Sequence, residues 1–469
     1  MSKVNVDQIV SPEQAIHPCL DWVKGQLIVG VNLRAGATAV LSSVQGLVSL
    51  DGLGPICPQG KAFNGAVSRT VADQFVKYLE TRPEGMLEDG RKLLDDLAAY
   101  LKRFIVFPKP WFPEVLASWI LGTYVFPVFQ TYPYLWISSP APGCGKSLLG
   151  GIMAKLSFNG EFMVAPTEAQ LFHLAESSRG VQVWDEVENS EEVDKKRFNL
   201  MRPVLLNGYR NGGAAPRQVG KNFERSARYH VFCPRVLIGL TKLPETALQR
   251  TIQVRLEKRS LNQKCELYIG AKYSDEERQL RERCLLWALQ TADQVNRCYQ
   301  DDGLRSDLEE LLGSGRLSDD IWLPLLGVAS AATAADQDFL GSLKRAAKEL
   351  STTTRTEIVQ PQSPAVARNE HVAKKDEKAI ALQTALNRME YSGPVTPRQL
   401  AKDVSQVSGR EVTTQRLSKD LAKIGIRAKK KKGCRIFVTT PPERESARRK
   451  LSGQQGQEDM SSGAIEARV

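Results

Sequence analysis

The stretch "YLWISSPAPGCGKSLLG" (residues 134–150) decides how this chain is expected to fold. Its beginning, "YLWIS", is an apolar run with the length of a buried strand, and "KSLLGGIMAKL" (146–156) has apolar residues at helical spacing. A turn rich in Gly and Pro joins the two segments. In such a turn, consecutive backbone N–H groups can point at one place and bind phosphate oxygens.

The residue types in this turn fit the phosphate loop of a nucleotide site. The glycines allow close approach, the lysine neutralises the outer phosphates, and the following hydroxyl binds Mg²⁺. The predicted nucleotide contacts are Gly143, Cys144, Gly145, Lys146, Ser147 and Leu148, with ATP and Mg²⁺ as cofactors. Pro140 replaces the first glycine of the motif at the loop entrance, where a fixed φ is tolerable. A tight strand–helix turn without a ligand is the alternative.

An acidic pair follows 39 residues after Lys146. "VQVWDE" (181–186) is an apolar strand pattern with Asp185 and Glu186 at its carboxyl end. We expect Asp185 to hold Mg²⁺ through water and Glu186 to polarise the water that attacks the γ-phosphate. Alone, the pair is equally typical of a solvated acidic turn. Together with the phosphate loop at this separation, it predicts a working site.

Strand and helix patterns alternate through this part of the chain. Strands are predicted at 134–138, 161–165, 181–186, 235–240 and 251–256. Strands separated by helices predict a parallel sheet with both faces covered. One of the helices is expected to begin at a capping box formed by Thr167 and Gln170. The segment 208–228 mixes glycines with arginines and is interpreted as a mobile basic loop, which could contact DNA, hold inter-subunit arginines, or simply be exposed.

These motifs together resemble the AAA+ ATPases, whose "GPPGxGKT" loop is similar to "PAPGCGKS" here. More narrowly, the chain resembles the helicase-like ATPases of phages and integrative islands over about residues 110–440, in runs such as "LLNGYRNGGAAPR" and "LSDDIWLPLLGVA". The resemblance implies that Thr241 is a sensor residue and that Arg250 is an arginine finger supplied to a neighbouring subunit. A surface arginine is the alternative for Arg250. The family usually has an arginine near "LSDDIW", where this chain has Ser318 and Asp319, with Arg316 as the nearest substitute.

The excess positive charge of the chain is concentrated near its C-terminus. The net charge is +11, and residues 410–450 contain 14 Lys/Arg against 4 Asp/Glu. Such asymmetry indicates a polyanionic partner, usually nucleic acid. Segment 379–440 has the pattern of a winged helix: helices at 378–389, 396–409 and 412–426, then a basic turn leading into a strand. The predicted DNA contacts are Gln415, Arg416, Lys419, Lys423, Lys429, Lys430, Lys431 and Lys432. A protein-binding winged helix with a solvated charge run is the alternative.

The expected fold class is α/β: a P-loop AAA+-type parallel five-stranded sheet with a helical lid, an N-terminal α+β region and a C-terminal winged helix. The expected domains are a β-rich region at 1–66, a helical region at 67–130, the ATPase core at 131–258, the lid at 259–355, a linker at 356–378, the winged helix at 379–440 and a disordered tail at 441–469.

Composition excludes several other classes. The uncharged run 115–145 is interrupted by prolines, so a buried helix and strand are favoured over a membrane span, and a cytoplasmic location is expected. Eight scattered cysteines and four dispersed histidines lack the clustering of a zinc site.

Three functions remain open at this point. The first is a DNA helicase or translocase of a mobile genetic element, which binds single- or double-stranded DNA as a ring oligomer with the hexamer as the expected form. The second is a replication initiator or loader that uses ATP as a switch. The third is a winged-helix DNA-binding regulator with a degenerate ATPase, which Pro140 slightly favours.

Overall fold

The computed structural model describes residues 16–32, 38–49, 67–164, 166–187, 202–219, 225–240, 243–260, 262–313, 315, 317–359, 385, 395–408, 413–423, 426, 429–431 and 434–436. The chain divides into two compact units, 1–358 and 359–469, and each is described by itself.

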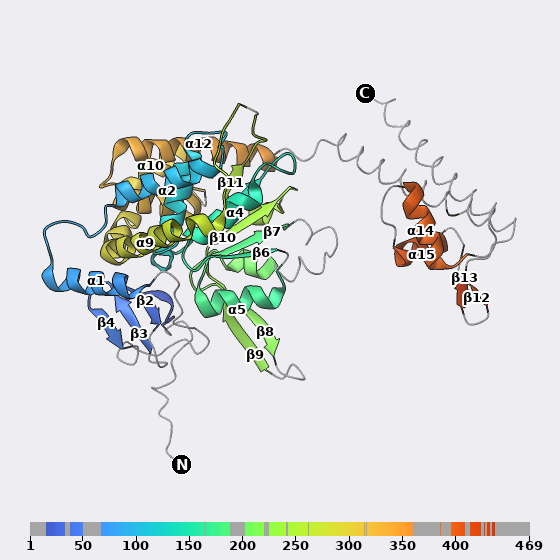
Figure 1. Cartoon of the computed structure of the whole chain (residues 1–469), viewed down its shortest axis with the longest axis horizontal. Helices are drawn as coiled ribbons and strands as arrows, with labels where there is room; N and C mark the ends of the chain where they lie inside the picture. The colour runs from blue at the N-terminus through green and yellow to red at the C-terminus, as the bar shows by residue number, and fades with distance from the viewer. Residues whose placement is uncertain are drawn as a thin grey trace, which may run out of the picture. The chain divides into compact units, whose positions relative to one another are not determined.

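A five-stranded parallel sheet forms the centre of the first unit (Figure 1). Its strands are β5 (Tyr134–Ser138), β6 (Glu161–Val164), β7 (Gln182–Asp185), β10 (Arg235–Gly239) and β11 (Thr251–Arg255). The order across the sheet is β11-β5-β10-β7-β6, and every neighbouring pair is parallel. All five strands predicted from the sequence are therefore confirmed, as is their parallel arrangement.

Alternation along these strands separates two hydrophobic cores. In β5, Leu135 and Ile137 belong to one buried cluster, whereas Tyr134 and Trp136 belong to the other. Successive side chains of a strand point to opposite faces, so a strand buried on both sides needs apolar residues at every position. This explains why the sequence shows continuous apolar runs rather than alternation with polar residues.

Helix α4 (Lys146–Leu156) covers the first face, on β7 and β10. Gly150 makes this close packing possible: a Cβ there would lie 2.2 Å from Cδ1 of Ile238 and 3.2 Å from Cγ1 of Val183. Such contacts have no room for a side chain, so the glycine fixes how near the helix lies to the sheet.

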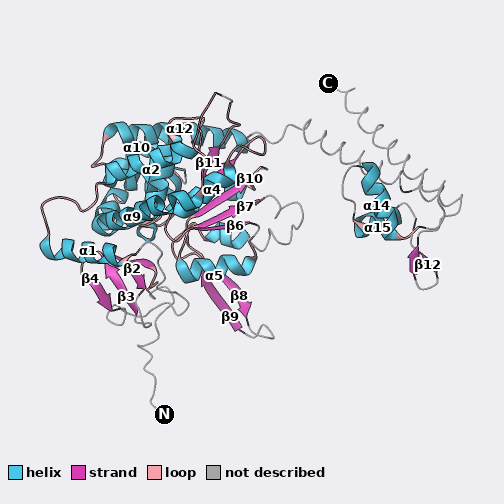
Figure 2. Cartoon of the chain, viewed as in Figure 1, coloured by secondary structure: helices cyan, strands magenta, loops and turns pink. Residues whose placement is uncertain are grey.

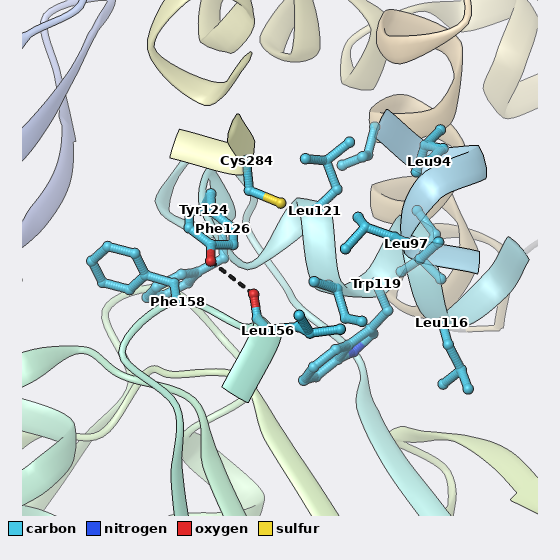
Figure 3. Packing of buried hydrophobic residues seen from close by; sticks show 14 of the residues in the cluster. Leu94, Leu97, Leu116, Trp119, Leu121, Tyr124, Phe126, Leu156, Phe158 and Cys284 are labelled. Carbon is cyan, nitrogen blue, oxygen red and sulfur yellow. Dashed lines mark hydrogen bonds between the residues drawn. The ribbon is translucent and has the colours of Figure 1, made fainter. Parts of the chain in front are cut away.

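Further helices complete the core on this side. They are α2 (Gly90–Phe104), α3 (Phe112–Gly122), α9 (Gly270–Tyr299), α10 (Asp302–Leu312), the π-helical turn η6 (Leu317–Trp322), α11 (Leu323–Ala332) and α12 (Gln337–Val359), with the short η5 (Phe126–Val128) after α3. Figure 3 shows part of this core, with side chains of α2, α3 and α9 near those of α4, and the Tyr124 hydroxyl donating to the Leu156 carbonyl at 2.7 Å. The predicted helical regions before and after the sheet thus share one core with it.

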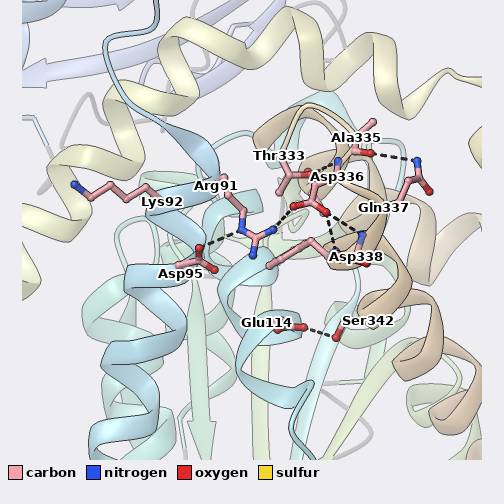
Figure 4. Close-up of polar contacts among 12 residues, drawn as sticks. Arg91, Lys92, Asp95, Glu114, Thr333, Ala335, Asp336, Gln337, Asp338 and Ser342 are labelled. Carbon is pink, nitrogen blue, oxygen red and sulfur yellow. Dashed lines mark hydrogen bonds and ion pairs between the residues drawn. The ribbon is translucent and has the colours of Figure 1, made fainter.

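Polar contacts join α12 to the helices that precede the sheet. Arg91 of α2 binds Asp336, and the Ser342 hydroxyl of α12 donates to Glu114 of α3 (Figure 4). These contacts connect segments more than 200 residues apart in the sequence.

The N-terminal region is a four-stranded antiparallel sheet in sequential order. Its strands are β1 (Leu20–Val23), β2 (Gln26–Asn32), β3 (Thr38–Ser42) and β4 (Gly46–Ser49), and α1 (Arg69–Thr81) lies against β4. Buried residues of β1 and β2 belong to the same cluster as α9. The predicted β-rich region therefore packs directly on the first unit's main core.

Polar groups hold this sheet to α5 (Glu168–Ser178). Arg179, just after α5, donates to the Leu20 carbonyl and pairs with Asp21 at 2.9 Å. The buried His17 ring lies 2.5 Å from the Glu176 carbonyl through Nε2, and its Nδ1 accepts from the Cys19 N–H. Burial and the nearby Arg179 charge lower the pKa of His17 to about 3, so the ring is neutral.

Helix α5 covers the second face and begins as predicted, since Thr167 and Gln170 form both halves of the capping box. The expected loop at 208–228 is wrong in part: β8 (Ala214–Val219) and β9 (Arg225–His230) form an antiparallel ribbon (Figure 1). Buried Ala215 and Tyr229 anchor the ribbon in the second core. Glycines and arginines masked this strand pattern in the sequence.

A buried arginine ties the amino ends of the strands together. Arg235, at the start of β10, is fully buried and donates to Gln182 of β7, to the Tyr134 hydroxyl of β5 at 2.8 Å, and to the carbonyls of Gly208 and Val231. These acceptors are neutral, yet they satisfy the guanidinium, which burial would otherwise penalise heavily.

The second unit contains α14 (Pro397–Ser408), α15 (Thr414–Lys423) and the ribbon β12 (Lys429–Lys431) with β13 (Cys434–Ile436) (Figure 2). Thr396 caps α14, because its hydroxyl accepts from the Gln399 N–H. The predicted basic turn is wrong at residues 429–431, which form a strand. The predicted first helix of this unit lies almost entirely outside the described residues, and so does the predicted tail.

Two sequence expectations concern absent features. Among the described helices, none has both the length and the apolar character needed to cross a bilayer. Within the same described part of the chain, no group of acidic, His and Cys side chains is arranged to hold a metal ion by itself.

We predict that Glu176→Gln removes part of the pH dependence of stability. Burial raises the pKa of Glu176 to about 7, above its ordinary 4.5, so the folded protein favours the neutral acid. The stability that this group contributes is complete below pH 4.5 and is lost as the pH rises through about 7. The free energy of unfolding, measured with urea, should therefore rise in the variant by about 1–3 kcal/mol relative to wild type between pH 5 and pH 8. An equal difference at both pH values would contradict this.

Candidate nucleotide site

The turn between β5 and α4 has the backbone of a phosphate-binding loop. Gly143 and Gly145 have φ values of 79° and 87°, in the left-handed region that favours glycine. A Cβ at Gly143 would meet nothing within 4 Å, and one at Gly145 only Ile105, at 3.7 Å. The backbone conformation, and not lack of space, therefore requires glycine at both positions. Cys144 and Leu148 are half-buried against the first core and anchor the turn.

Lys146 is the first residue of α4, so it stands where the helix dipole is positive and backbone N–H groups are unpaired. Its side chain is half-buried, and Nζ donates to the Ser139 hydroxyl at 2.7 Å. Ser147, the next residue, is exposed. A helix start with these donors, a cation and a free hydroxyl is chemically suited to a phosphate group with a bound divalent cation.

Asp185 is the last residue of β7, at the same edge of the sheet as the loop. It follows Val183 by two positions, and Val183 faces the core on the α4 side, so alternation places Asp185 on that side. β10 lies between β5 and β7, which puts the two strand ends about 10 Å apart. The half-buried carboxylate and the start of α4 therefore flank one region at the carboxyl ends of the strands, where α/β sheets bind ligands.

Glu186 has an unusual backbone. Its φ is 58°, its N–H bonds to the Asp185 carboxylate at 2.9 Å, and the next residue, Val187, donates to the Ile238 carbonyl of β10. A left-handed conformation outside glycine costs about 1–2 kcal/mol. Such cost is often found at functional sites, and here it exposes Glu186 at the edge that carries the loop.

Arg250 lies at the opposite end of the strands, beside their amino ends. It precedes β11, and Thr251 pairs with Tyr134, the first residue of β5. A five-residue strand separates it from the loop, a distance of about 16 Å. Its guanidinium stacks 4.7 Å from the Tyr209 ring and donates to the Thr246 carbonyl. The strand registers thus do not bring Arg250 to the loop of its own chain.

The remaining predicted residues are placed only in part. Thr241 and Lys432 lie outside the described residues, as does Arg316. Gln415 and Lys419 are exposed on α15, which also contains Arg416 and Lys423, while Lys429, Lys430 and Lys431 form β12. Their assignment to DNA stays a prediction.

Two residues of interest had no sequence signal. Ser139 holds the Lys146 ammonium, and Tyr209 supports the Arg250 guanidinium. Both contacts depend on how the turn or the strand ends fold, which residue spacing does not reveal.

No protein family and no curated protein matches the sequence. Among solved structures, the apo A form of the NrS-1 C-terminal region is similar over 76% of each chain, with 12% identity and a TM-score of 0.28. SCCmec type IV Cch, described as an active helicase, is similar over 91% of this chain and 79% of its own, with 9% identity and a TM-score of 0.32. TM-scores this low establish neither a shared fold nor a shared activity.

We predict that Lys146→Ala weakens ATP binding by at least about tenfold, since charge-assisted hydrogen bonds contribute about 1.5–3 kcal/mol each. Lys155→Ala is the matched control, because Lys155 is an exposed lysine in the last turn of the same helix. Isothermal titration with ATP and Mg²⁺ should show the loss only for Lys146. Equal affinity in the two variants would exclude the turn as the phosphate site.

Proposed function

We propose that this chain is an ATP-dependent DNA helicase or translocase that acts as a ring oligomer, with Arg250 supplied in trans. The mobile-element setting belongs to the same proposal and rests on the sequence resemblance alone. The observation that carries the proposal is the left-handed glycine turn that leads from β5 into α4, with Lys146 at the helix start.

The residues around this turn suit ATP hydrolysis. The backbone N–H groups of residues 143–148 and the Lys146 ammonium would bind the phosphates. Ser147 and Asp185 would hold Mg²⁺, which neutralises developing charge on the phosphates when bound. Glu186, exposed on a strained backbone at the same edge, would orient and polarise the attacking water.

Arg250 fits a role in a neighbouring subunit better than one in its own. It directly precedes β11, whose other end lies beside the loop, so phosphates bound by the loop of the same chain are out of its reach. The stacking on Tyr209 would orient the guanidinium at the amino edge of the sheet. An arginine supplied across an interface stabilises charge in the transition state of phosphoryl transfer.

The second unit is proposed to bind DNA as a winged helix. Helices α14 and α15 share a small core that includes Leu400, Val404, Leu417 and Leu421, and this core leaves Gln415 and Lys419 exposed. The basic strand β12 would contact phosphates, whose neutralisation releases counterions and makes affinity salt-dependent.

We predict that single-stranded DNA raises the ATP turnover of the full chain severalfold. In the variant with Lys429, Lys430 and Lys431 changed to Ala, stimulation should require more DNA. The log–log salt slope of duplex binding should fall by about two to three, at roughly 0.9 per lost contact. A variant with Lys92 and Lys102 of α2 changed to Ala removes exposed charge elsewhere and should behave as wild type.

Other outcomes would decide between the alternatives. ATP turnover without any DNA response would favour a switch protein over a motor. DNA binding without turnover would favour a regulator with a degenerate ATPase, and an unchanged salt slope would remove the lysine strand from the DNA interface.

We predict that Arg250→Ala lowers turnover at least about a hundredfold, because arginine fingers contribute 10³–10⁵ in comparable enzymes. Lys146→Ala should be equally inactive. Mixing the two purified variants should restore part of the turnover, since some interfaces then combine an intact loop with an intact arginine. Turnover that stays absent on mixing, with both variants folded by circular dichroism and assembled by light scattering, would show that Arg250 does not act in trans.

A further inference from the structure

Ser139 occupies a particular place in the turn. It lies between the end of β5 and Pro140, and its residue surface is only 5% exposed. Its hydroxyl has two partners within hydrogen-bond distance: Nζ of Lys146 at 2.7 Å and the carbonyl oxygen of Ala141 at 2.6 Å. The predicted phosphate motif assigns no role to this position.

The direction of both hydrogen bonds follows from the groups involved. An ammonium can only donate and a carbonyl oxygen can only accept. The single Ser139 hydroxyl proton therefore goes to Ala141, and an oxygen lone pair accepts from Lys146. The hydroxyl has one orientation that satisfies both neighbours, so the three groups form a short directed chain: Lys146 to Ser139 to Ala141.

Pro140 lies between the two residues that this hydroxyl contact joins. Proline has no backbone N–H to donate, and it restricts the preceding residue to extended backbone. The contact from the Ser139 hydroxyl to the Ala141 carbonyl spans Pro140 and closes the loop entrance. The hydroxyl at position 139 thus links the residues on either side of Pro140.

We propose that Ser139 is a positioning residue that holds the Lys146 ammonium over the nucleotide phosphates, an inference that rests on the proposed function. An ammonium has three N–H donors, so the bond to Ser139 leaves two for phosphate oxygens. A lysine that is already held loses less side-chain freedom when the nucleotide binds. Because Lys146 is half-buried and Ser139 is buried, water competes less for this bond than on an open surface.

If Ser139 instead kept Lys146 away from the phosphates, Ser139→Ala would change the ATP affinity in the opposite direction. If the Ser139 hydroxyl only occupied Lys146 in the absence of nucleotide, its removal would free the ammonium and tighten ATP binding. The two roles are therefore separated by the direction of one measured change.

The test compares nucleotide affinities by isothermal titration in the full chain with Mg²⁺. Ser139→Ala should weaken ATP about three- to tenfold, the cost of leaving one long side chain to be immobilised on binding. AMP affinity should change less, since the lysine reaches the β- and γ-phosphates. Ser139→Thr keeps the hydroxyl and should restore ATP binding, and Ser138→Ala, which removes the neighbouring hydroxyl, should match wild type.

A double-mutant cycle shows whether Ser139 acts through Lys146. In the Lys146→Ala background, Ser139→Ala should leave the residual ATP affinity unchanged. Tighter ATP binding by Ser139→Ala, an equal loss for ATP and AMP, or an undiminished effect without Lys146 would each overturn the inference.

Failure of the proposed function has a different signature. Wild-type protein that binds ATP but shows no turnover with DNA would end the motor proposal and leave the Ser139 cycle interpretable. Wild-type protein that binds neither ATP nor inorganic tripolyphosphate would overturn both.

Discussion

The buried guanidinium of Arg235 is the interaction on which the sheet most depends. It lies at the amino end of the central strand β10, fully excluded from solvent, and its hydrogen bonds reach β5, β7 and the segments on either side of the β8–β9 ribbon. Gly208 shows how tightly this group is enclosed, because a Cβ there would lie 2.2 Å from Nη1 of Arg235. A charge buried among neutral acceptors is stable only when each donor is satisfied. The strand ends that meet at Arg235 are therefore held in one arrangement.

The fixed alignment of the amino ends of the strands also affects their carboxyl ends. Parallel strands of fixed length that are aligned at one end are also aligned at the other. The loop after β5 and the acidic residues after β7 therefore owe part of their relative placement to a residue in no contact with either. Gly150 acts in the same sense on the helix, because it sets how closely α4 lies on β7 and β10.

The sequence was most informative where periodicity and burial agree. The five parallel strands are buried on both faces, so their apolar runs are unbroken, and all were predicted. The capping box of α5 was predicted because its two residues act locally. The β8–β9 ribbon was missed, since only Ala215 and Tyr229 of its described side chains belong to the core and its glycines and arginines are typical of loops. The lysine strand β12 was missed for a similar reason, because lysine is uncommon in strands.

The residue types of the candidate site could be predicted from the sequence, but the neighbouring side chains that hold them in place could not. Gly143 and Gly145 have the left-handed backbone that the motif needs, and Asp185 ends a strand at the same edge. The contacts of Ser139 and Tyr209 depend on tertiary structure, and neither residue has a periodic or compositional signal. The β-rich character of the N-terminal region was predicted, whereas the order of its strands and its packing on α9 were not, since no local pattern specifies which surfaces meet.

The positions of Arg250 and the loop at the two ends of the sheet also bear on the proposed assembly. If Arg250 serves the loop of another copy, the donor and the acceptor lie at opposite ends of the strands on each chain. Should they also lie on different faces of the subunit, the contact is heterologous, and copies joined by it form an open row or a closed ring. In an open row of copies joined in this way, the loop of the terminal copy receives no arginine. Only a closed ring supplies an arginine to every loop. A closed assembly completes every nucleotide site, whereas an open row leaves one site without its arginine. Closure would therefore be favoured for any number of subunits.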